Sequence, residues 1–299
     1  MLKLQRQLDA FGACREVRPD LLARAVVYCD GVVAMATEDT ETLHRLFCLE
    51  GKSALVTGAG GGLGSALAEG LAGAGAAVAL ADVPGSQALR EVHDRLAMHG
   101  YTVSTVEADL SDVSVVPAMV QQVVDHHGSI DILVNCAGIN QREPILEVTP
   151  DTYDRIMKIN LRAVYFLSQA AARAMKDNGS GKIINVGSLT SAIALSDISV
   201  YGCTKSAVAQ LTKTMAVEWA QYNIQVNAIG PGFMLTPLSD PVWANATRRH
   251  WMEDRIPARR GGQPDELVGV AILLASTASS YISGQIIFVD GGFLAGSPW

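Results

Sequence analysis

From Lys52 to the carboxyl terminus, short β-rich runs alternate with segments of helix length. The runs are rich in valine, isoleucine, leucine and alanine, as strands are when helices cover both faces of a parallel sheet. They occupy residues 53–57, 76–82, 102–109, 131–135, 182–188, 224–230 and 285–292. Strands that alternate with helices form βαβ units. The pattern therefore predicts an α/β chain with a seven-stranded parallel sheet between two layers of helices.

The intervening segments predict helices that pack on this sheet. Their expected ranges are residues 63–74, 87–99, 113–127, 151–176, 200–221 and 264–276. Asp112, Pro150 and Pro264 stand at three of the beginnings, where a capping acid or a proline in the first turn favours a helix start. Strands and helices together predict a single domain over residues 47–299.

Residues 1–46 do not follow this alternation. The apolar spacing of residues 21–33 predicts one or two helices, with a break at Asp30-Gly31. We expect an amino-terminal extension of unknown role that is helical or partly disordered.

Composition excludes several classes of function. With 49% hydrophobic residues in 299, the chain can bury a sizeable core. A net charge of -7 and a pI near 5.4 argue against binding to nucleic acid or to an anionic membrane surface. The mean hydropathy is +0.22, yet charges or glycines break every long apolar stretch before the roughly 20 residues of a membrane span. The five cysteines contain no CxxC pair and the six histidines form no ligand set, so we expect reduced thiols, a cytoplasmic location and no metal.

A glycine-rich loop follows the first predicted strand directly, and a helix begins within it. A strand that turns sharply into a helix points free backbone N–H groups and the positive end of the helix dipole at a pyrophosphate. Gly58 would permit the turn, Gly62 the close approach of the phosphates, and Gly64 the packing of the helix. The loop predicts a dinucleotide site on a three-layer Rossmann fold. Its expected cofactor contacts are Gly58, Gly60, Gly61, Gly62, Leu63 and Gly64.

The second predicted strand ends at Asp82, 18 residues after Gly64. A carboxylate at this place accepts hydrogen bonds from the adenosine ribose of NAD and repels the 2′-phosphate of NADP. Neither residues 59–61 nor Val83-Pro84 offers the arginine or lysine that an NADP site usually provides. We therefore expect NAD as the cofactor, in preference to NADP.

Tyr201 and Lys205 stand four residues apart in a segment predicted as a long helix, so their side chains share one face. Ser188 comes just after the fifth predicted strand, at the end of the sheet where open α/β folds bind ligands. A tyrosine with the ordinary pKa of about 10 is a poor base at neutral pH. A nearby ammonium and an oxidised nicotinamide both favour the phenolate and so lower this pKa. The three residues predict proton transfer to or from a substrate oxygen.

With these features, the chain resembles the short-chain dehydrogenase/reductase family over residues 47–292. The TGxxxGxG loop and the spacing of thirteen residues between Ser188 and Tyr201 carry the resemblance most strongly. The chain departs from the family pattern at Cys136, where a second asparagine is usual. The further matching residues are Asp82, Asp109, Leu110, Asn135, Ala137, Gly138, Asn160, Lys205, Pro231, Gly232 and Thr236.

The resemblance implies roles for these residues. Tyr201 would exchange a proton with the substrate oxygen, Ser188 would hydrogen-bond that oxygen, and Lys205 would hold the nicotinamide ribose and lower the tyrosine pKa. Asn160 would bind a water that links Lys205 to solvent, which completes the catalytic set. The remaining cofactor contacts would be Asp82 and Asn135 at the adenosine ribose, Asp109 and Leu110 at the adenine, Ala137 and Gly138 along the backbone, and Pro231, Gly232 and Thr236 at the nicotinamide, together with Tyr201 and Lys205.

The substrate is less constrained, because function within a fold lies in its loops. Arg142, after the fourth predicted strand, could pair with a substrate carboxylate through two hydrogen bonds. Residues 235–260 are expected to form a flexible lid that carries Trp243. The expected substrate contacts are Arg142, Ser188, Tyr201 and Trp243. Residues 140–144 and 256–262 resemble the branch of the family that contains gluconate 5-dehydrogenase and 2-deoxygluconate 3-dehydrogenase.

These observations predict an NAD(H)-dependent oxidoreductase that interconverts a secondary alcohol and a ketone, on a sugar acid or another polyol. The alternative is a 3-oxoacyl-thioester (acyl carrier protein) reductase, a class that resembles the chain through the core but usually uses NADPH and a basic surface. A sugar-nucleotide epimerase would have a GxxGxxG loop, and a non-catalytic NAD-binding regulator would not need Tyr201 and Lys205. The resemblance also implies a homotetramer, formed through the helices at residues 151–176 and 200–221 and through the last strand and helix.

Overall fold

The computed structural model describes residues 25–27, 33–35 and 38–296. The chain divides into two compact units, residues 1–46 and 47–299. In the first unit, β1 (Ala25–Val27) pairs antiparallel with β2 (Val33–Met35), and α3 (Glu38–Phe47) follows. The helices predicted for residues 21–33 are wrong at the described residues of this range. Two of the three β1 residues and one of the three β2 residues are valine, whose branched side chain favours extended backbone. The break predicted at Asp30-Gly31 lies outside the described residues.

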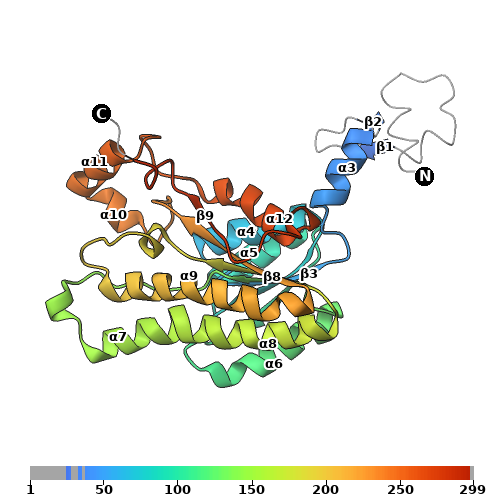
Figure 1. Ribbon diagram of the computed structural model, residues 1–299, viewed down its shortest axis with the longest axis horizontal. Helices are drawn as coiled ribbons and strands as arrows, with labels where there is room; N and C mark the ends of the chain where they lie inside the picture. Colours follow the sequence, from blue (N-terminus) through green and yellow to red (C-terminus); the bar gives the residue numbers. More distant parts are fainter. Residues whose placement is uncertain (1–24, 28–32, 36–37, 297–299) are drawn as a thin grey trace. The chain divides into compact units, whose positions relative to one another are not determined.

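The second unit is built on one seven-stranded sheet, in which every neighbouring pair of strands is parallel (Figure 1). The strands are in the order β5-β4-β3-β6-β7-β8-β9. This confirms the predicted fold, and each predicted run contains one strand to within its end residues. The strands are β3 (Ser53–Thr57), β4 (Ala77–Asp82), β5 (Val103–Glu107), β6 (Ile132–Asn135), β7 (Gly181–Val186), β8 (Ile224–Pro231) and β9 (Ile286–Val289).

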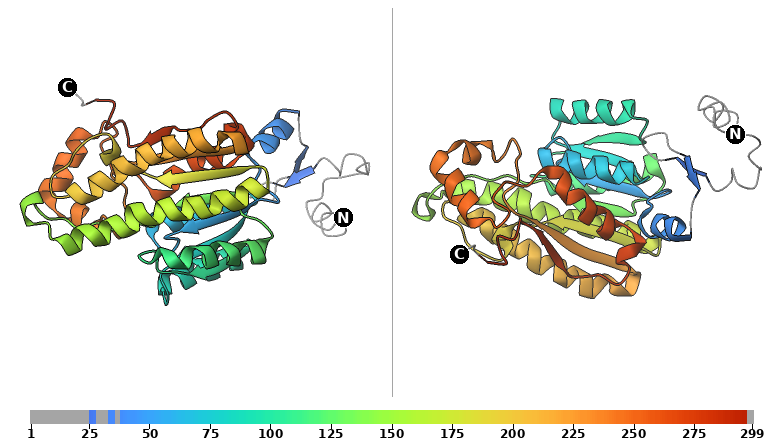
Figure 2. Two further views of the ribbon diagram at one scale, coloured as in Figure 1. Left: turned by 60° about the horizontal axis from the view of Figure 1, so that its bottom comes forward. Right: turned by 90° about the horizontal axis from the view of Figure 1, so that it is seen from above.

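Helices cover both faces of this sheet (Figures 1 and 2). One face packs against α4 (Gly62–Gly73), α5 (Gln87–Met98) and α12 (Val268–Ala275), and the other against α6 (Val116–His127), α8 (Ala163–Asp177) and α9 (Ser199–Trp219). Alternation along β3 serves both layers, because Ala54 and Val56 belong to one core cluster and Leu55 to the other. The two clusters are the two interfaces of a three-layer fold.

The predicted helix starts are visible in the capping geometry. The Asp112 carboxylate accepts a hydrogen bond from the Ser114 N–H at 2.9 Å, at the start of the 3-10 turn that leads into α6. Pro150 begins α7 (Pro150–Met157), where the Thr149 hydroxyl accepts from the Thr152 N–H. These caps satisfy N–H groups that a helix start otherwise leaves unpaired.

The strand order places a crevice between β3 and β6. The chain runs outward from β3 through β4 to β5 and then returns to β6, on the other side of β3. Beyond the ends of these two strands the backbone of Gly58 approaches Ala137 so closely that a Cβ on Gly58 would lie 2.9 Å from the Ala137 Cα. Gly58 has a φ of +67°, which favours glycine. A parallel sheet binds its ligands at such a reversal of strand order.

Among the described residues, no helix combines the length and the apolarity needed to cross a membrane.

Candidate active site

The glycine loop is fixed to the end of β4 by a carboxylate. Asp82 Oδ2 accepts a hydrogen bond from the Gly60 N–H at 2.9 Å, and Oδ1 accepts from the Val83 N–H at 2.8 Å. A Cβ on Gly64 would overlap the carbonyl oxygen of Gly58, so the first turn of α4 can pack on the loop only with glycine there. These contacts explain why glycine occupies positions 60 and 64, and they hold the negative charge of Asp82 at the end of β4.

A cavity of about 130 Å³ opens beside this loop. Its mostly apolar walls come from the ends of β3, β4 and β6 and from the segment after β5, which suits a planar aromatic base. It brings together six of the predicted cofactor residues, which are Gly58, Asp82, Asp109, Leu110, Ala137 and Gly138. The Asp109 carboxylate also accepts a hydrogen bond from the Ser111 N–H at 2.9 Å.

Asn135, predicted at the adenosine ribose, is the last residue of β6, and its side chain lies in the core. Its side chain is 3% exposed, and its amide donates to Ser168 Oγ at 2.9 Å and to Asn185 Oδ1 at 2.8 Å. Both amide hydrogens are therefore used in the core, between β6, β7 and α8. The side chain of this last β6 residue points into the layer of helices, so the ribose contact predicted for Asn135, which stays a prediction, would fall to its backbone.

Asn160 lies in a turn of π-helix, Lys158–Arg162, that interrupts the long helix predicted over residues 151–176. It is fully buried, and its amide donates to the Ile139 carbonyl at 2.8 Å while its Oδ1 accepts from the Ile139 N–H at 2.9 Å. These two bonds fix the backbone that follows β6. Turns of π-helix often occur at functional sites, and here the wider turn sets Asn160 against the strand end.

Ser188, Tyr201 and Lys205 line one cavity of about 350 Å³. Ser188 follows β7, and the other two residues lie in the first two turns of α9. Lys205 Nζ donates to the Val186 carbonyl at 2.7 Å and lies 5.6 Å from the centre of the Tyr201 ring. Other predicted residues on its wall are Leu63, Gly138, Arg142, Pro231, Gly232, Thr236 and Trp243. Gly138 also lines the smaller cavity, so the two cavities adjoin.

Burial dominates the electrostatics of this cavity. It raises the pKa of Tyr201, while the hydrogen bond with Ser188 and the charge of Arg142 act in the opposite direction. Burial also lowers the pKa of Lys205 to about 8. Lys205 does not bring the tyrosine pKa below its ordinary value in the structure: that pKa is raised, because desolvation disfavours the phenolate more strongly than the nearby groups favour it.

The loop that carries Arg142 and the predicted lid both bond to a third segment, at Asp197. Residues 235–260 contain two short helices, α10 (Asp240–Ala244) and α11 (Ala246–Arg255). Arg248 on α11 forms an ion pair with Asp197 at 3.1 Å, and the Asp197 carbonyl accepts from the Glu143 N–H at 2.9 Å. Arg142 is exposed to solvent, yet partial desolvation and the charge of Arg248 lower its pKa. The lid, the Arg142 loop and the Asp197 segment are thus joined at one side of the cavity.

Trp243 forms part of the lid wall. Its Nε1 donates to the Met234 carbonyl at 3.3 Å, and a Cβ on Gly261 would collide with its ring. Trp251, in contrast, packs edge-on against Phe233 at a centroid distance of 6.2 Å and lies 6.1 Å from Phe293. Trp243 therefore faces the cavity, and Trp251 anchors α11 to the carboxyl-terminal segment.

Three polar residues of the cavity wall were not predicted: Ser239, whose hydroxyl donates to the Met234 and Thr236 carbonyls, and Asn140 and Thr190. Asn140 is two residues from Arg142, and Thr190 is two residues from Ser188. Their positions just beyond strand ends were a signal for both, since open α/β folds bind ligands there. Polar residues at such loops are common, however, and without the fold nothing distinguished these two.

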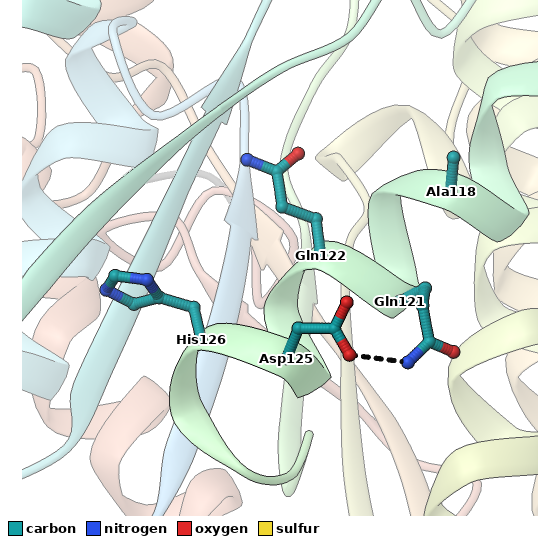
Figure 3. Close-up of a pocket in the computed structure, with 5 residues that line it drawn as sticks. All are labelled: Ala118, Gln121, Gln122, Asp125 and His126. Atoms are coloured by element: carbon teal, nitrogen blue, oxygen red, sulfur yellow. Dashed lines mark hydrogen bonds between the residues drawn. The ribbon is translucent and has the colours of Figure 1, made fainter.

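A hollow of about 430 Å³ also lies along the exposed face of α6 (Figure 3). Its lining comes from this single helix, and Gln121 Nε2 donates to Asp125 Oδ1 at 2.8 Å across one turn. The residues that line it are Ala118, Gln121, Gln122, Asp125 and His126. None of the predicted site residues is among them, and the spacing is that of an ordinary solvated helix surface.

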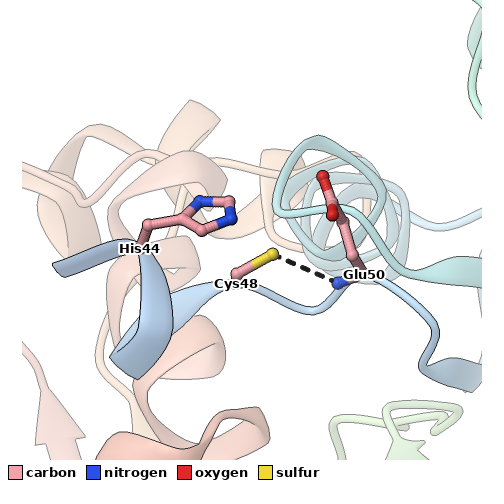
Figure 4. A group of neighbouring side chains, drawn as sticks. All are labelled: His44, Cys48 and Glu50. Carbon is pink, nitrogen blue, oxygen red and sulfur yellow. Dashed lines mark hydrogen bonds between the residues drawn. The ribbon is translucent and has the colours of Figure 1, made fainter. Parts of the chain in front are cut away.

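Three of the five cysteines lie among the described residues, and none of these is in a disulfide. Burial raises the pKa of Cys136, on the cavity wall, to about 11, so its thiol is neutral. Cys48 Sγ accepts a hydrogen bond from the Glu50 N–H at 3.4 Å (Figure 4). His44, also drawn there, belongs to the amino-terminal unit, and the absence of a metal stays a prediction.

Comparison with known proteins agrees with this geometry. Residues 58–294 match a family model described as enoyl-(acyl carrier protein) reductase. The chain is 41% identical to gluconate 5-dehydrogenase of Gluconobacter oxydans, with 83% of this chain and 96% of the relative covered. It is 42% identical to 2-dehydro-3-deoxy-D-gluconate 5-dehydrogenase of Dickeya dadantii, with 83% of this chain and 98% of the relative covered.

A solved structure shares the fold as well. The crystal structure of a gluconate 5-dehydrogenase from Burkholderia cenocepacia, in complex with NADP and tartrate, superposes with a TM-score of 0.82 at 40% identity. The match covers 85% of this chain and 99% of that chain. The family model extends over the glycine loop, the Ser188 segment and α9, and the relatives are covered almost in full, so the chain belongs to the short-chain dehydrogenase/reductase family.

Proposed function

We propose that the protein is an oxidoreductase that interconverts a secondary alcohol and a ketone on a sugar acid, with NAD(H) as the cofactor. The observation that carries the proposal is the single cavity that holds Ser188, Tyr201 and Lys205 together with the cation of Arg142. A proton-transfer group and a carboxylate-binding group in one small cavity suit a substrate that carries a hydroxyl and a carboxylate. The sugar-acid names of the relatives support the same substrate class.

The residues present fit a dinucleotide. The two adjoining cavities offer an apolar slot beside Asp82 and a larger chamber of mixed polar and apolar walls beside Lys205, and the glycine loop lies between β3 and α4. Members of this family use a nicotinamide cofactor, which when bound accepts a hydride from the alcohol or returns one to the ketone. Lys205 has one N–H committed to the Val186 carbonyl, which leaves two donors for ribose hydroxyls.

The protein's own part in the reaction is proton transfer and charge stabilisation. During oxidation the Tyr201 phenolate would take the proton of the substrate hydroxyl, and during reduction the phenol would return it. The Ser188 hydroxyl would donate a hydrogen bond to the same oxygen as its charge changes. Arg142 would hold the carboxylate, which fixes the distance between the reacting carbon and Tyr201.

Asp82 supports NAD rather than NADP. Its carboxylate is held in place by two backbone N–H groups at the mouth of the smaller cavity, where a 2′-phosphate would meet a like charge. No arginine or lysine lines that cavity among the described residues. NADP is the second candidate, because the Burkholderia relative was crystallised with it.

Steady-state kinetics with NAD and NADP on D-gluconate would decide between the cofactors. We expect kcat/KM to be at least about tenfold higher with NAD than with NADP. Asp82→Ser should reduce this ratio, because it removes the carboxylate that repels the 2′-phosphate of NADP. A preference of the unaltered protein for NADP would show that Asp82 does not set cofactor choice.

A cytoplasmic location stays a prediction.

A further inference from the structure

Buried polar atoms without partners gather near the active-site cavity. In the part of the chain that the structure describes, four buried side-chain atoms have no hydrogen-bond partner: Ser53 Oγ, Asn140 Oδ1, Glu143 Oε1 and Thr190 Oγ1. Asn140 and Thr190 line the cavity of Tyr201, and Glu143 is the residue after Arg142. An unpaired buried polar group is costly, and folded proteins retain few. Two such atoms on the wall of one cavity, Asn140 Oδ1 and Thr190 Oγ1, point to a ligand that supplies the partners.

The backbone N–H and carbonyl of Thr190 are both hydrogen-bonded, and only its side-chain hydroxyl has no partner. The residue is 4% exposed. Its backbone N–H donates to Ser188 Oγ at 3.1 Å, and its carbonyl accepts from Ser206 Oγ at 3.2 Å. The neighbouring Ser191 Oγ donates to the Lys205 carbonyl at 2.9 Å. The 3-10 turn Leu189–Ser191 is thereby fixed to Ser188 and to α9, and a rotation about the Thr190 Cα–Cβ bond exchanges the hydroxyl with the methyl group.

Asn140 lies on the segment that follows β6, the strand next to β7, and Asn160 holds that segment in place. It follows Ile139, whose N–H and carbonyl both bond to the buried Asn160. β6 and β7 pair in parallel, so the segments that carry Asn140 and Thr190 both leave the sheet at the same edge. The two side chains therefore border one cavity from adjacent strand ends, with Ser188 on the same wall as Thr190.

We propose that Thr190 and Asn140 bind hydroxyl groups of the substrate other than the reacting one, and that the site therefore selects a fully hydroxylated sugar acid over a deoxy sugar acid. This inference rests on the proposed function. Ser188 and Tyr201 take the reacting oxygen and Arg142 the carboxylate, so Asn140 and Thr190 are left for the remaining hydroxyls. A substrate hydroxyl can donate to Asn140 Oδ1, and it can donate to or accept from Thr190 Oγ1.

The selectivity follows from what a missing hydroxyl leaves behind. A deoxy sugar acid would enter the same cavity but would leave one buried polar atom unpaired. Sites built to hydrogen-bond a substrate hydroxyl reject an analogue that lacks it far better than apolar pockets reject an extra group. The relatives include enzymes named for both kinds of substrate, a gluconate and a 3-deoxygluconate derivative. These two residues would place this chain with the first kind.

The test compares kcat/KM for D-gluconate with that for 3-deoxy-D-gluconate and 4-deoxy-D-gluconate. We expect D-gluconate to be favoured over at least one deoxy acid by about tenfold or more, the factor that one neutral hydrogen bond supplies. Thr190→Val keeps the shape of the side chain and removes the hydroxyl, and Asn140→Leu removes the amide. In one of these variants the kcat/KM ratio of D-gluconate to that deoxy acid should fall to about the square root of its value in the unaltered protein, or lower. Thr190→Ser should retain it.

Ser53→Ala is the matched control, because Ser53 also buries an unpaired hydroxyl but lies at the start of β3, outside the cavity. It should leave the ratio of the substrates unchanged. NADH binding followed by fluorescence would show that each variant is folded. Equal kcat/KM for D-gluconate and both deoxy acids in the unaltered protein would overturn this inference and leave the proposed function standing. Absence of turnover with every sugar acid would remove the proposed function itself.

Discussion

At the residue scale, the reaction depends on how Tyr201 is surrounded. Burial raises its pKa, and the hydrogen bond with Ser188 and the charge of Arg142 partly oppose that effect. At neutral pH the residue is thus a phenol, which suits proton donation to a ketone. Oxidation of an alcohol needs the phenolate, so kcat/KM for oxidation should rise with pH through the neutral range, while kcat/KM for reduction should fall at high pH.

Replacing Tyr201 by phenylalanine removes only the proton-transfer group. We expect Tyr201→Phe to lower kcat by roughly 10²–10⁴-fold, the usual contribution of a general acid or base. The dissociation constant of NADH should change little, because Lys205 keeps its bond to the Val186 carbonyl. Steady-state kinetics and fluorescence titration measure the two quantities. Retained turnover would remove Tyr201 from the mechanism.

Arg142 links substrate binding to the pH profile. Its charge lowers the pKa of Tyr201, so in Arg142→Gln that pKa should rise and the pH limb of the oxidation rate should move to higher pH. KM for a sugar acid should also rise, by about tenfold or more for a lost charge-assisted hydrogen bond. Arg249→Gln, a lid arginine that does not line the cavity, should leave both quantities unchanged. An unshifted pH profile in Arg142→Gln would show that Arg142 is not coupled to Tyr201.

At the element scale, the glycine loop and the first turn of α4 act as one unit. The loop is tied to β4 through Asp82 and to β6 through the close approach of Gly58 and Ala137. Gly64 closes the unit, because any side chain there would meet the Gly58 carbonyl. The phosphates of a dinucleotide would therefore bind to backbone that cannot shift independently of three strands.

Gly64→Ala tests this rigidity. The added Cβ would push the loop away from α4, so we expect the affinity for NADH to fall by about tenfold or more and the thermal midpoint to drop by several degrees, as for overpacked sites. Gly269→Ala on α12 is the control, since a Cβ there meets nothing within 4 Å. That change should raise the midpoint slightly, because alanine is the better helix former. Equal behaviour of the two variants would contradict the packing described for Gly64.

The elements also show what the sequence could and could not predict. Most of the seven strands were predictable because buried parallel strands are continuously apolar, and the edge strand β5, which is partly polar, followed from its place in the alternation with helices. Ser188, Tyr201 and Lys205 followed from spacing on such elements. The π-turn at Lys158–Arg162 was not, since its two extra bonds to Ile139 come from a distant segment. Nor was the inward direction of Asn135, which depends on Ser168 and Asn185.

At the scale of the whole molecule, two long helices leave apolar side chains uncovered. On α8, Tyr165 and Phe166 are partly exposed and contact each other edge-on, and Val217 on α9 is 80% exposed. Exposed aromatic and aliphatic groups on adjacent helices are typical of surfaces that another subunit covers. We therefore retain the homotetramer as a prediction.

Sedimentation velocity at micromolar concentration measures the assembly. We expect the mass of four chains for the unaltered protein and a smaller species for Phe166→Arg, which places a charge in the proposed interface. Met98→Arg on α5 serves as the control, because Met98 is also exposed but lies on the opposite face of the sheet. A monomer in the unaltered protein would contradict the prediction.

The most direct measurement of the central claim is the initial rate of NADH oxidation with 5-keto-D-gluconate, set beside the rate with a 3-oxoacyl thioester. We predict turnover of the keto sugar acid that saturates and is abolished in Tyr201→Phe, with little or no turnover of the thioester. Efficient reduction of the thioester and none of the sugar acid would contradict the account and identify the protein as an acyl-thioester reductase.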